Sequence, residues 1–506
     1  MSAPTPSNPA IAPEVPAPQG SLRRNTFYNI AGSIVPIFVS LVTVPLYLHD
    51  IGIARYGILA IVWLLLGYFS VFDLGLARAT TNQVAKLRHA PLSERSQLFW
   101  TATLLNMGFG VIGGLCVYGA GGVVFGYFVK TTPALHNEVL STLPWLAASI
   151  PLATMSGVFT GTLAGCERFL LVNTLQVFGT MLFQIVPLVV AIMHGPTLRW
   201  IIPAAILTRL VTSVPLAVAA GLVLPAGKPQ WPTPHWVRVL LGYGAWVSVT
   251  NFIGPILEAF DRLLIGVILG AAAVAYYSVP FNLANRLRIL PGALAGVLFP
   301  RFSQQNDAAS RTLATASVRI LAAAVTPVSV AGILGLGPFI DIWISPAFSH
   351  VAAPVGQIIL IGVWISSLAH VPFAWLQAQG RPDLVAKFHA VELVPFLGVL
   401  WVGLHALGLP GAALVWSLRT AVDAVLLFWA SGQGLPSLRS LWPGALAVIL
   451  AWLLAQPGFM VTWLRVGFGA LLFVISIFWA HRQAPELWQW IQKGHARGHL
   501  LRTKRP

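Results

Sequence analysis

The chain of 506 residues carries 30 Lys and Arg against 14 Asp and Glu, and charged residues make up only 9% of it. A soluble globular protein carries about 25% charged residues, whereas 57% of this chain is apolar, so the composition excludes a soluble fold and indicates a polytopic all-α membrane protein. The net charge of +16 would suit nucleic acid only if the basic residues shared one face.

The first predicted element is a Pro-rich tail over residues 1–27. It has no apolar core of the kind that a secretory signal requires, so we expect a disordered tail that stays on the chain. At the other end, residues 482–506 are predicted to form a basic tail.

Fourteen apolar runs lie between the tails, and each is long enough to cross ~30 Å of hydrocarbon as a helix of about 20 residues. The sequence predicts them at residues 28–48, 56–76, 99–128, 143–164, 170–194, 199–224, 238–268, 272–299, 317–340, 351–376, 384–407, 409–431, 440–456 and 461–481. A Pro- and Trp-rich break at residues 225–237 separates the first six runs from the rest.

The basic residues alternate between the predicted loops. The two tails and every second loop hold 23 Lys and Arg, the other loops hold four (Arg55, Lys130, Arg199 and Arg465), and three fall within spans. Because basic residues concentrate on the cytoplasmic side, both termini are predicted to be cytoplasmic. Most of the positive charge therefore reports orientation, and we expect no nucleic-acid partner.

The predicted spans repeat. Gly52 and Gly270 occupy similar surroundings 218 residues apart, and Leu163 and Leu376 do so 213 residues apart. The shared offset predicts two parallel six-helix halves, at residues 28–224 and 238–431, joined by a cytoplasmic linker at 225–237 and followed by two additional helices at 440–481. Parallel halves are typical of transporters, with the substrate site between them near mid-membrane.

Charges inside spans cost ~2.5–3.5 kcal/mol on insertion scales, so each requires a reason. Arg286 shares a helix face with Asn282 and Asn285, and we interpret this face as the lining of a substrate cavity. Arg288 points about 200° away and should line a different surface unless the helix breaks. Two further arginines are cavity candidates, Arg78 and Arg209, although Arg78 is near a cytoplasmic end where snorkelling explains it equally well.

The remaining buried charges are candidates for ion coupling or gating. Glu258 and Arg262 are four residues apart, as are Arg419 and Asp423, so each is predicted to form a helical ion pair. Packing of self-neutralised pairs is the competing interpretation. The other candidates are Asp73 at the end of the second span, Asp261 beside the first pair, and Glu392, which has no obvious local partner.

Catalytic and nucleotide-binding motifs are missing from the sequence. It has no G-x-x-x-x-G-K-[ST] loop, no H-E-x-x-H and no nucleophile elbow. Cys116 and Cys166 form no metal or redox motif, so we expect no metal and no cofactor. The short outer loops hold too few charged residues for a polysaccharide polymerase or ligase site, which makes that enzyme class an alternative of lower rank.

Several short motifs occur in a consistent order over residues 25–480. They are the segment Asn29–Leu48, Asp73-Leu-Gly-Leu-Ala-Arg78 with Asn82 and Ala85, Asp261-Arg262 with Gly266 and Gly270, Leu376-Gln-Ala-Gln-Gly380-Arg381-Pro382, and then Lys387, His389, Glu392 and Gly411-Ala-Ala413. In this order they resemble the polysaccharide transporters of the multidrug/oligosaccharidyl-lipid/polysaccharide (MOP) flippase superfamily, the Wzx-type O-antigen flippases.

A second resemblance concerns Asn285-Arg286-Leu287, followed by Pro291-Gly292, Leu294 and Leu298-Phe-Pro300. This stretch is similar to a segment of the lipid II flippases, in which the matching arginine lines a cationic cavity for a lipid pyrophosphate. The first span departs from that pattern, since no arginine lies between Tyr28 and Leu48. The departure argues against lipid II and for a different polyprenyl-linked glycan.

The resemblance implies a flippase in the bacterial inner membrane that moves an undecaprenyl pyrophosphate-linked oligosaccharide by alternating access, for lipopolysaccharide or exopolysaccharide synthesis. It also implies polysaccharide polymerase and chain-length machinery as partners, and a groove for the lipid tail beside the last two helices. The nearest alternative is an ion-coupled drug/cation antiporter of the same superfamily. A non-transporting scaffold in a biosynthetic complex is a third possibility.

Overall fold

The computed structural model describes residues 19–68, 72–87, 90–224, 227–304, 307–456, 458 and 461–485, without the side chains of 19–34, 127–128, 243–259, 297, 300, 307, 434–439 and 462. Helix α1 includes residues 19–27 of the predicted N-terminal tail, and residues 1–18 lie outside the described part. Likewise α15 includes residues 482 and 483 of the predicted basic tail, most of which is outside the described part.

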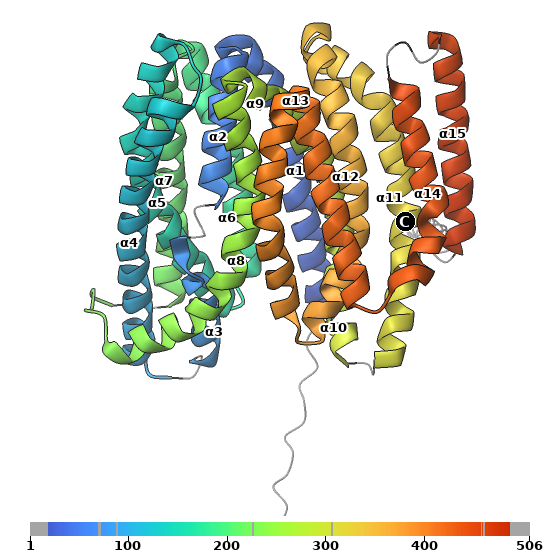
Figure 1. Ribbon diagram of the computed structural model, residues 1–506. Coiled ribbons are helices and arrows are strands. Elements are labelled where there is room, and N and C mark those ends of the chain that lie inside the picture. The colour runs from blue at the N-terminus through green and yellow to red at the C-terminus, as the bar shows by residue number, and fades with distance from the viewer. Residues whose placement is uncertain are drawn as a thin grey trace, which may run out of the picture.

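The described residues are helical and contain no strand (Figure 1). The helices are α1 (Gln19–Ile51), α2 (Ile53–Tyr68), α3 (Leu76–Lys86), α4 (Leu92–Val123), α5 (Pro133–Gly165), α6 (Phe169–His194), α7 (Leu198–Val223), α8 (Pro234–Ile268), α9 (Ala271–Asn285), α10 (Ile289–Gln304), α11 (Asp307–Trp343), α12 (Pro346–Ala378), α13 (Pro382–Ala430), α14 (Gly434–Ala455) and α15 (Thr462–Gln483). A π-helical turn, Val124–Phe128, extends α4, and a 3₁₀ turn, Arg286–Arg288, joins α9 to α10.

The predicted spans agree with these helices in most places. Eight helices of the described part are long and apolar enough to cross a membrane, and three shorter apolar helices accompany them. The single helix α13 covers two predicted spans, and it kinks at Gly408, where φ is 62° and Pro410 follows. The multi-span character is therefore confirmed, whereas the count of fourteen stays a prediction.

The second predicted span, residues 56–76, is wrong at its end. Helix α2 stops at Tyr68, and Leu74 and Gly75 adopt left-handed backbone conformations (φ 48° and 72°) before α3 begins. Two consecutive left-handed residues cannot continue a right-handed helix. Mean hydropathy does not locate this break, because the run 56–76 is apolar as a whole even though it contains Asp73 and Gly75.

The connections alternate between two ends of the molecule. We call the end at which α1 begins and α15 ends the terminal face, and the other end, with the loops near residues 52, 130 and 270, the opposite face (Figure 1). Helices α1–α7 form an N-terminal group, α8–α13 pack together as a second group, and α14 and α15 lie on α11 at its outer side. The division into two six-helix halves with a linker and two additional helices stays a prediction.

Helix α8 connects the two groups. Its first turns place Trp236 and Leu240 in an apolar cluster with Leu98, Leu216 and Leu224 of the N-terminal half. Its last turns place Ile265 in the main core with residues of α9 and α12. The same helix is therefore anchored in both halves, at its two ends.

The halves meet closely at the opposite face. Helix α2 packs against α9 so tightly that a Cβ atom at Gly57 would overlap the carbonyl oxygen of Ala271. Beside this contact, Lys130 donates a hydrogen bond from Nζ to the carbonyl oxygen of Ile268 at 3.1 Å. The structure is therefore closed between the halves at this end.

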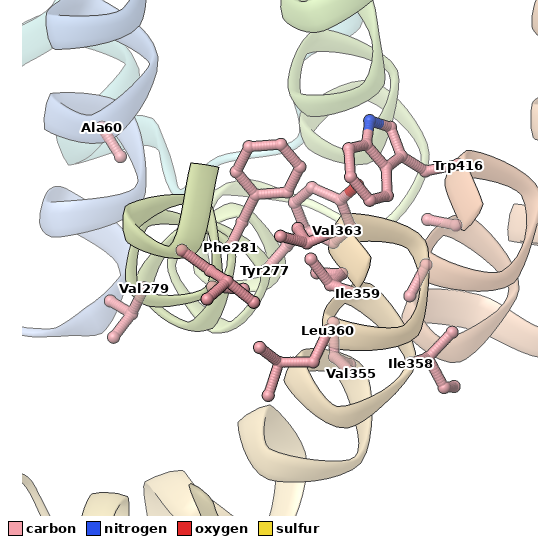
Figure 2. Packing of buried hydrophobic residues seen from close by; sticks show 14 of the residues in the cluster. Ala60, Tyr277, Val279, Phe281, Val355, Ile358, Ile359, Leu360, Val363 and Trp416 are labelled. Carbon is pink, nitrogen blue, oxygen red and sulfur yellow. The ribbon is translucent and has the colours of Figure 1, made fainter. Parts of the chain in front are cut away.

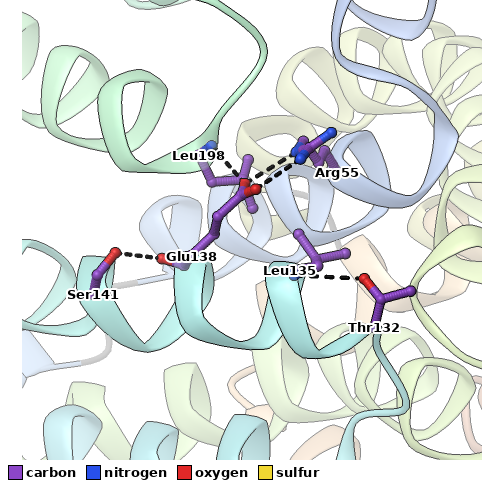
Figure 3. A network of polar contacts seen from close by, with 6 residues as sticks. All are labelled: Arg55, Thr132, Leu135, Glu138, Ser141 and Leu198. Atoms are coloured by element: carbon purple, nitrogen blue, oxygen red, sulfur yellow. Dashed lines mark hydrogen bonds and ion pairs between the residues drawn. The ribbon is translucent and has the colours of Figure 1, made fainter.

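A partly buried ion pair orders the N-terminal half near the same face (Figure 3). Arg55 of α2 donates two hydrogen bonds to the carboxylate of Glu138 on α5, at 3.0 and 2.7 Å. Glu138 also accepts a hydrogen bond from the amide of Leu198, the first residue of α7, at 3.0 Å. The carboxylate thus joins three helices and stabilises the positive end of the α7 dipole.

The contact at Gly57 predicts a size limit. Gly57→Ala forces α2 and α9 apart and should cost about 1–3 kcal/mol, the range for overpacking. The measurement is the thermal unfolding of the purified protein in detergent. Gly67→Ala is the matched control, since Gly67 lies on the same helix and has no atom within 4 Å of an added Cβ. Equal unfolding temperatures for the two variants would contradict the close contact.

The Glu138 carboxylate predicts a ranking of substitutions. Glu138→Ala loses both the ion pair and the bond to Leu198, Glu138→Gln keeps an oxygen for Leu198, and Arg55→Ala keeps that bond intact. Glu138→Ala should therefore lower the unfolding temperature most, with a charged hydrogen bond contributing about 1.5–3 kcal/mol. An equal loss for Arg55→Ala and Glu138→Ala would mean that the bond to α7 contributes nothing.

Candidate functional site

A cavity of ≈ 260 Å³ lies between the two halves. The N-terminal half contributes residues of α1, α2 and α6, including Ser40, Trp63 and Gln184, and the second half contributes residues of α9 and the end of α11. Trp343 of α11 donates a hydrogen bond to the carbonyl oxygen of Leu41 on α1 at 2.6 Å and so closes one wall. We call this space the inter-half cavity.

Arg286 lines the inter-half cavity together with Asn282. Arg286 begins the 3₁₀ turn between α9 and α10, and its side chain is exposed. Neither an ion pair nor a hydrogen bond from its guanidinium to another described residue is present. A fixed positive charge therefore faces the space between the halves, with no counter-ion among the side chains that the structure describes.

The 3₁₀ turn separates Arg286 from its neighbours. Asn285, expected on the same face as Arg286, accepts a hydrogen bond from Arg288 at 3.3 Å and lines neither wall of the inter-half cavity. Arg288 lines a different cavity of ≈ 190 Å³ within the C-terminal half. The expectation that Arg286 and Arg288 line different surfaces agrees with this geometry, although the helix is broken between them.

A third cavity, of ≈ 430 Å³, lies among α5, α6 and α7, and we call it the N-half cavity. Arg209 of α7 lines it and donates a hydrogen bond to the carbonyl oxygen of Leu66 at 3.1 Å. Leu66 is in the last turn of α2, where carbonyl groups lack helical partners, so Arg209 stabilises the end that the α2 break creates. The N-half cavity and the inter-half cavity share Thr180 and Phe183 as lining residues.

Two predicted site residues near the α2 break lie elsewhere. Arg78 is exposed on α3 and lines none of the three cavities in the described part. Asp73 is buried and accepts the amide hydrogen of Ala77 with both carboxylate oxygens, at 3.1 and 3.0 Å. Its carboxylate therefore caps the start of α3.

The charges at the end of α8 belong to the core. Asp261 and Arg262 are almost fully buried, Tyr277 donates a hydrogen bond to Asp261 at 2.9 Å, and the Arg262 guanidinium lies 4.2 Å from the ring centre of Phe281. Figure 2 shows Tyr277 and Phe281 in the apolar packing with Trp416. The predicted partner of Arg262, Glu258, has its side chain outside the described part. The predicted Glu258–Arg262 pair therefore stays a prediction, and Arg262 contacts Asp261 and the aromatic rings.

The acidic and basic groups of α13 pair differently from the prediction. Arg419 approaches Glu392 at 3.6 Å, and Asp423 approaches His389 at 3.5 Å. These contacts join the two helical parts of α13 across its kink, whereas the predicted pair Arg419–Asp423 would have stayed within one part. The i,i+4 rule fails because it applies to pairs within one helix and contains no information on the segment that packs back against that helix.

The cavity of ≈ 190 Å³ that Arg288 lines contains three of these α13 groups, and we call it the C-terminal cavity. Arg288, His370, His389, Arg419 and Asp423 all line it. His370 is within hydrogen-bond distance of the carbonyl oxygen of Ser366 through Nδ1, at 2.7 Å. No set of three or more His, Cys, Asp and Glu suited to a metal ion occurs among the described residues.

The structure adds polar residues that sequence reasoning missed. Ser40 and Gln184 line the inter-half cavity, and Gln176 with several hydroxyl side chains lines the N-half cavity. Uncharged polar residues are common in membrane helices, so only their position in three dimensions distinguishes them. The one available signal was the spacing of Gln176, Thr180 and Gln184, four residues apart on one face of α6.

Comparisons with known proteins identify relatives of this chain. The family model described as polysaccharide biosynthesis protein matches residues 22–305. A putative O-antigen transporter of Shigella flexneri is 27% identical over 411 residues, which cover 81% of this chain and 97% of the relative. The structure is similar to the lipid II flippase MurJ in an inward closed conformation (TM-score 0.70, 12% identity, 91% of this chain and 99% of the other).

A second solved structure has the same fold. It is an inward-facing multidrug resistance MATE family transporter of the MOP superfamily, with a TM-score of 0.67 and 15% identity over 80% of this chain and 97% of that one. At these identities the two structures establish the shared fold. The all-helical architecture predicted from the sequence is confirmed, and its fold is that of these two structures.

The pairing in α13 predicts which substitution is costly. Glu392→Gln removes the partner of the buried Arg419, and leaving one charge of a buried pair unpaired costs about 3–5 kcal/mol. Asp423→Asn leaves the Arg419–Glu392 contact intact and should cost clearly less. Thermal unfolding of both variants in detergent measures the difference. The reverse order would favour the Arg419–Asp423 pair expected from helical spacing.

Proposed function

The chain belongs to the polysaccharide biosynthesis protein family, and we propose that it is a flippase for a lipid-linked glycan. The substrate is an undecaprenyl pyrophosphate-linked oligosaccharide, and the protein moves it across the bacterial inner membrane for cell-surface polysaccharide synthesis. Both termini lie in the cytoplasm in this proposal, so the terminal face is the cytoplasmic face.

The observation that carries the proposal is the unpaired arginine in the inter-half cavity. Arg286 faces that cavity with no counter-ion among the described residues. A guanidinium binds phosphate oxygens bidentately and with charge-assisted hydrogen bonds. A pyrophosphate head therefore supplies the negative charge that the cavity lacks, with Asn282 as an additional hydrogen-bonding group.

The closure at the opposite face supports alternating access. Gly57 and Lys130 hold the halves together at that end. A hydrated head cannot cross hydrocarbon unaided, so the cavity shelters it while the lipid tail stays in the bilayer. Rocking of one half against the other then separates α2 from α9 and opens the cavity to the other side. Polymerase and chain-length machinery would receive the glycan there.

The relatives support the same class of substrate. The Shigella relative is named a putative O-antigen transporter, and O-antigen is a glycan. A catalytic activity has no comparable support, because the Shigella relative is named as a transporter and the two similar structures as a flippase and a transporter. The groove beside α14 and α15 remains part of the proposal as the place for the lipid tail.

A drug/cation antiporter is less well supported. A cavity for organic cations requires acidic residues, and neither the inter-half cavity nor the N-half cavity has an Asp or Glu among its described lining residues. The C-terminal cavity has one acid among its described lining residues, Asp423, which approaches His389 at 3.5 Å, while Glu392 lies outside its lining and approaches Arg419. We keep Glu392, Arg419 and Asp423 as candidates for ion coupling or gating in the flippase.

The role of Arg286 predicts a transport defect. Arg286→Ala removes the only charged group of the inter-half cavity among its described lining residues and should slow flipping about tenfold or more. Arg286→Lys should keep part of the rate, since it retains the charge and loses the bidentate geometry. The measurement is the flipping of labelled undecaprenyl pyrophosphate-linked glycan in vesicles that contain the purified protein.

The matched control is Arg465→Ala. Arg465 is an arginine of α15 that lines none of the three cavities, so its loss should leave the rate unchanged. A normal rate for Arg286→Ala would remove the assigned role. Absence of flipping by the unaltered protein would contradict the proposed function itself.

A further inference from the structure

The N-half cavity has the size of a ligand site. Its volume of ≈ 430 Å³ falls within the range of about 300–1,000 Å³ for small-molecule pockets. Its walls come from α5, α6 and α7, which lie together in the N-terminal half (Figure 1). The transport of a pyrophosphate through the inter-half cavity does not by itself account for this second space.

The lining of the N-half cavity is rich in uncharged polar groups. Five hydroxyl residues contribute to it, together with Gln176 and Arg209, and its described lining residues include no acid. The hydroxyl residues are Ser156, Thr160, Thr180, Thr212 and Ser213. An apolar ligand or a lipid tail would offer nothing to the acceptor oxygens of these hydroxyls or to the side-chain amide of Gln176, which is unfavourable away from water.

The hydroxyl groups present acceptors to the cavity. Each donates its proton to a carbonyl oxygen of its own helix: Thr180 to Gln176 at 2.8 Å, Thr212 to Thr208 at 2.9 Å and Ser213 to Leu210 at 2.7 Å. Ser156 and Thr160 do the same on α5. Because a hydroxyl has one proton and two lone pairs, the oxygen remains free to accept from a ligand.

A ligand that matches this lining is rich in hydroxyl donors and carries no positive charge. Sugars have this chemistry. The side-chain amide of Gln176 has no hydrogen-bond partner among the described residues, because only its backbone carbonyl is bonded to Thr180, and it offers both donors and an acceptor. Arg209 uses Nη1 for Leu66, which leaves further N–H groups for sugar oxygens or for an acidic sugar.

The position of the N-half cavity agrees with the order of groups in a lipid-linked glycan. Thr180 and Phe183 belong to its wall and to the wall of the inter-half cavity, where Arg286 lies. The first sugar is bonded directly to the pyrophosphate, so it must lie next to the site that holds the phosphate. We propose that the N-half cavity binds the sugars nearest the pyrophosphate, and this inference rests on the proposed function.

The test separates sugar binding from pyrophosphate binding. Two probes are compared with full-length protein in nanodiscs: the lipid-linked glycan extracted from cells that make it, and undecaprenyl pyrophosphate without sugars. The variants are Gln176→Leu and Thr212→Val, which remove polar groups and change little volume. Thr174→Val is the matched control, because Thr174 makes the same bond to its own helix, at 2.9 Å to Leu170, but does not line the cavity.

We expect Gln176→Leu and Thr212→Val each to raise the Kd for the lipid-linked glycan about fivefold to tenfold, the effect of one lost hydrogen bond. The Kd for the sugar-free lipid should stay unchanged in both. Arg286→Ala should raise the Kd for both probes, and Thr174→Val for neither.

Two results would overturn the inference. If Gln176→Leu and Thr212→Val weaken the binding of both probes equally, the N-half cavity holds pyrophosphate. If these two variants bind like Thr174→Val while Arg286→Ala weakens the binding of both probes, the sugars lie elsewhere and the proposed function survives. Failure of the unaltered protein to bind either probe would refute the proposed function together with this inference.

Discussion

Hydrocarbon offers no hydrogen-bond partners, and this constraint explains where the protein's charges lie. A charge within the bilayer must be paired, capped or exposed to a water-filled space. Asp261 meets Tyr277, Glu392 meets Arg419, and Asp73 caps α3. Arg286 differs from all of these, since it faces a cavity and makes no pair with a described residue. The paired groups maintain the fold, whereas in the proposed function Arg286 binds the substrate.

The same constraint explains where the backbone leaves the α-helical conformation. The α2 break and the 3₁₀ turn at Arg286 both interrupt helices within the apolar part of the chain, where unsatisfied carbonyl groups would be costly. Arg209 satisfies one of the freed carbonyls of α2 and at the same time lines the N-half cavity. The 3₁₀ turn directs Arg286 and Arg288 into separate cavities. Each interruption thus occurs where it also shapes a polar space.

Hydrophobic length predicted the all-helical, multi-span character and the division of α13 at Gly408, but not the break before α3 or the 3₁₀ turn at Arg286. Hydrophobic length and charge alternation were insufficient for contacts between distant segments. Arg55 and Glu138 are 83 residues apart, and Arg209 and Leu66 are 143 residues apart, so helical spacing contains no information about either pair. Asn282 and Arg286 were recognised because they share one helix face, whereas Asn285 was misplaced because the 3₁₀ turn changes the direction of the chain.

An empty polar cavity would normally destabilise a membrane protein, and the hydroxyl residues resolve this conflict. In Thr180 and Thr212 the proton is bonded within the helix, so the group that is most costly to leave unpaired is already satisfied. The oxygen retains acceptor capacity without requiring a fixed partner. Arginine cannot satisfy its donors within its own helix in this way, because its five N–H groups exceed what one carbonyl oxygen can accept. The fold can therefore tolerate many hydroxyl groups around its cavities but only a few arginines, and those few identify where an anionic head is expected to bind.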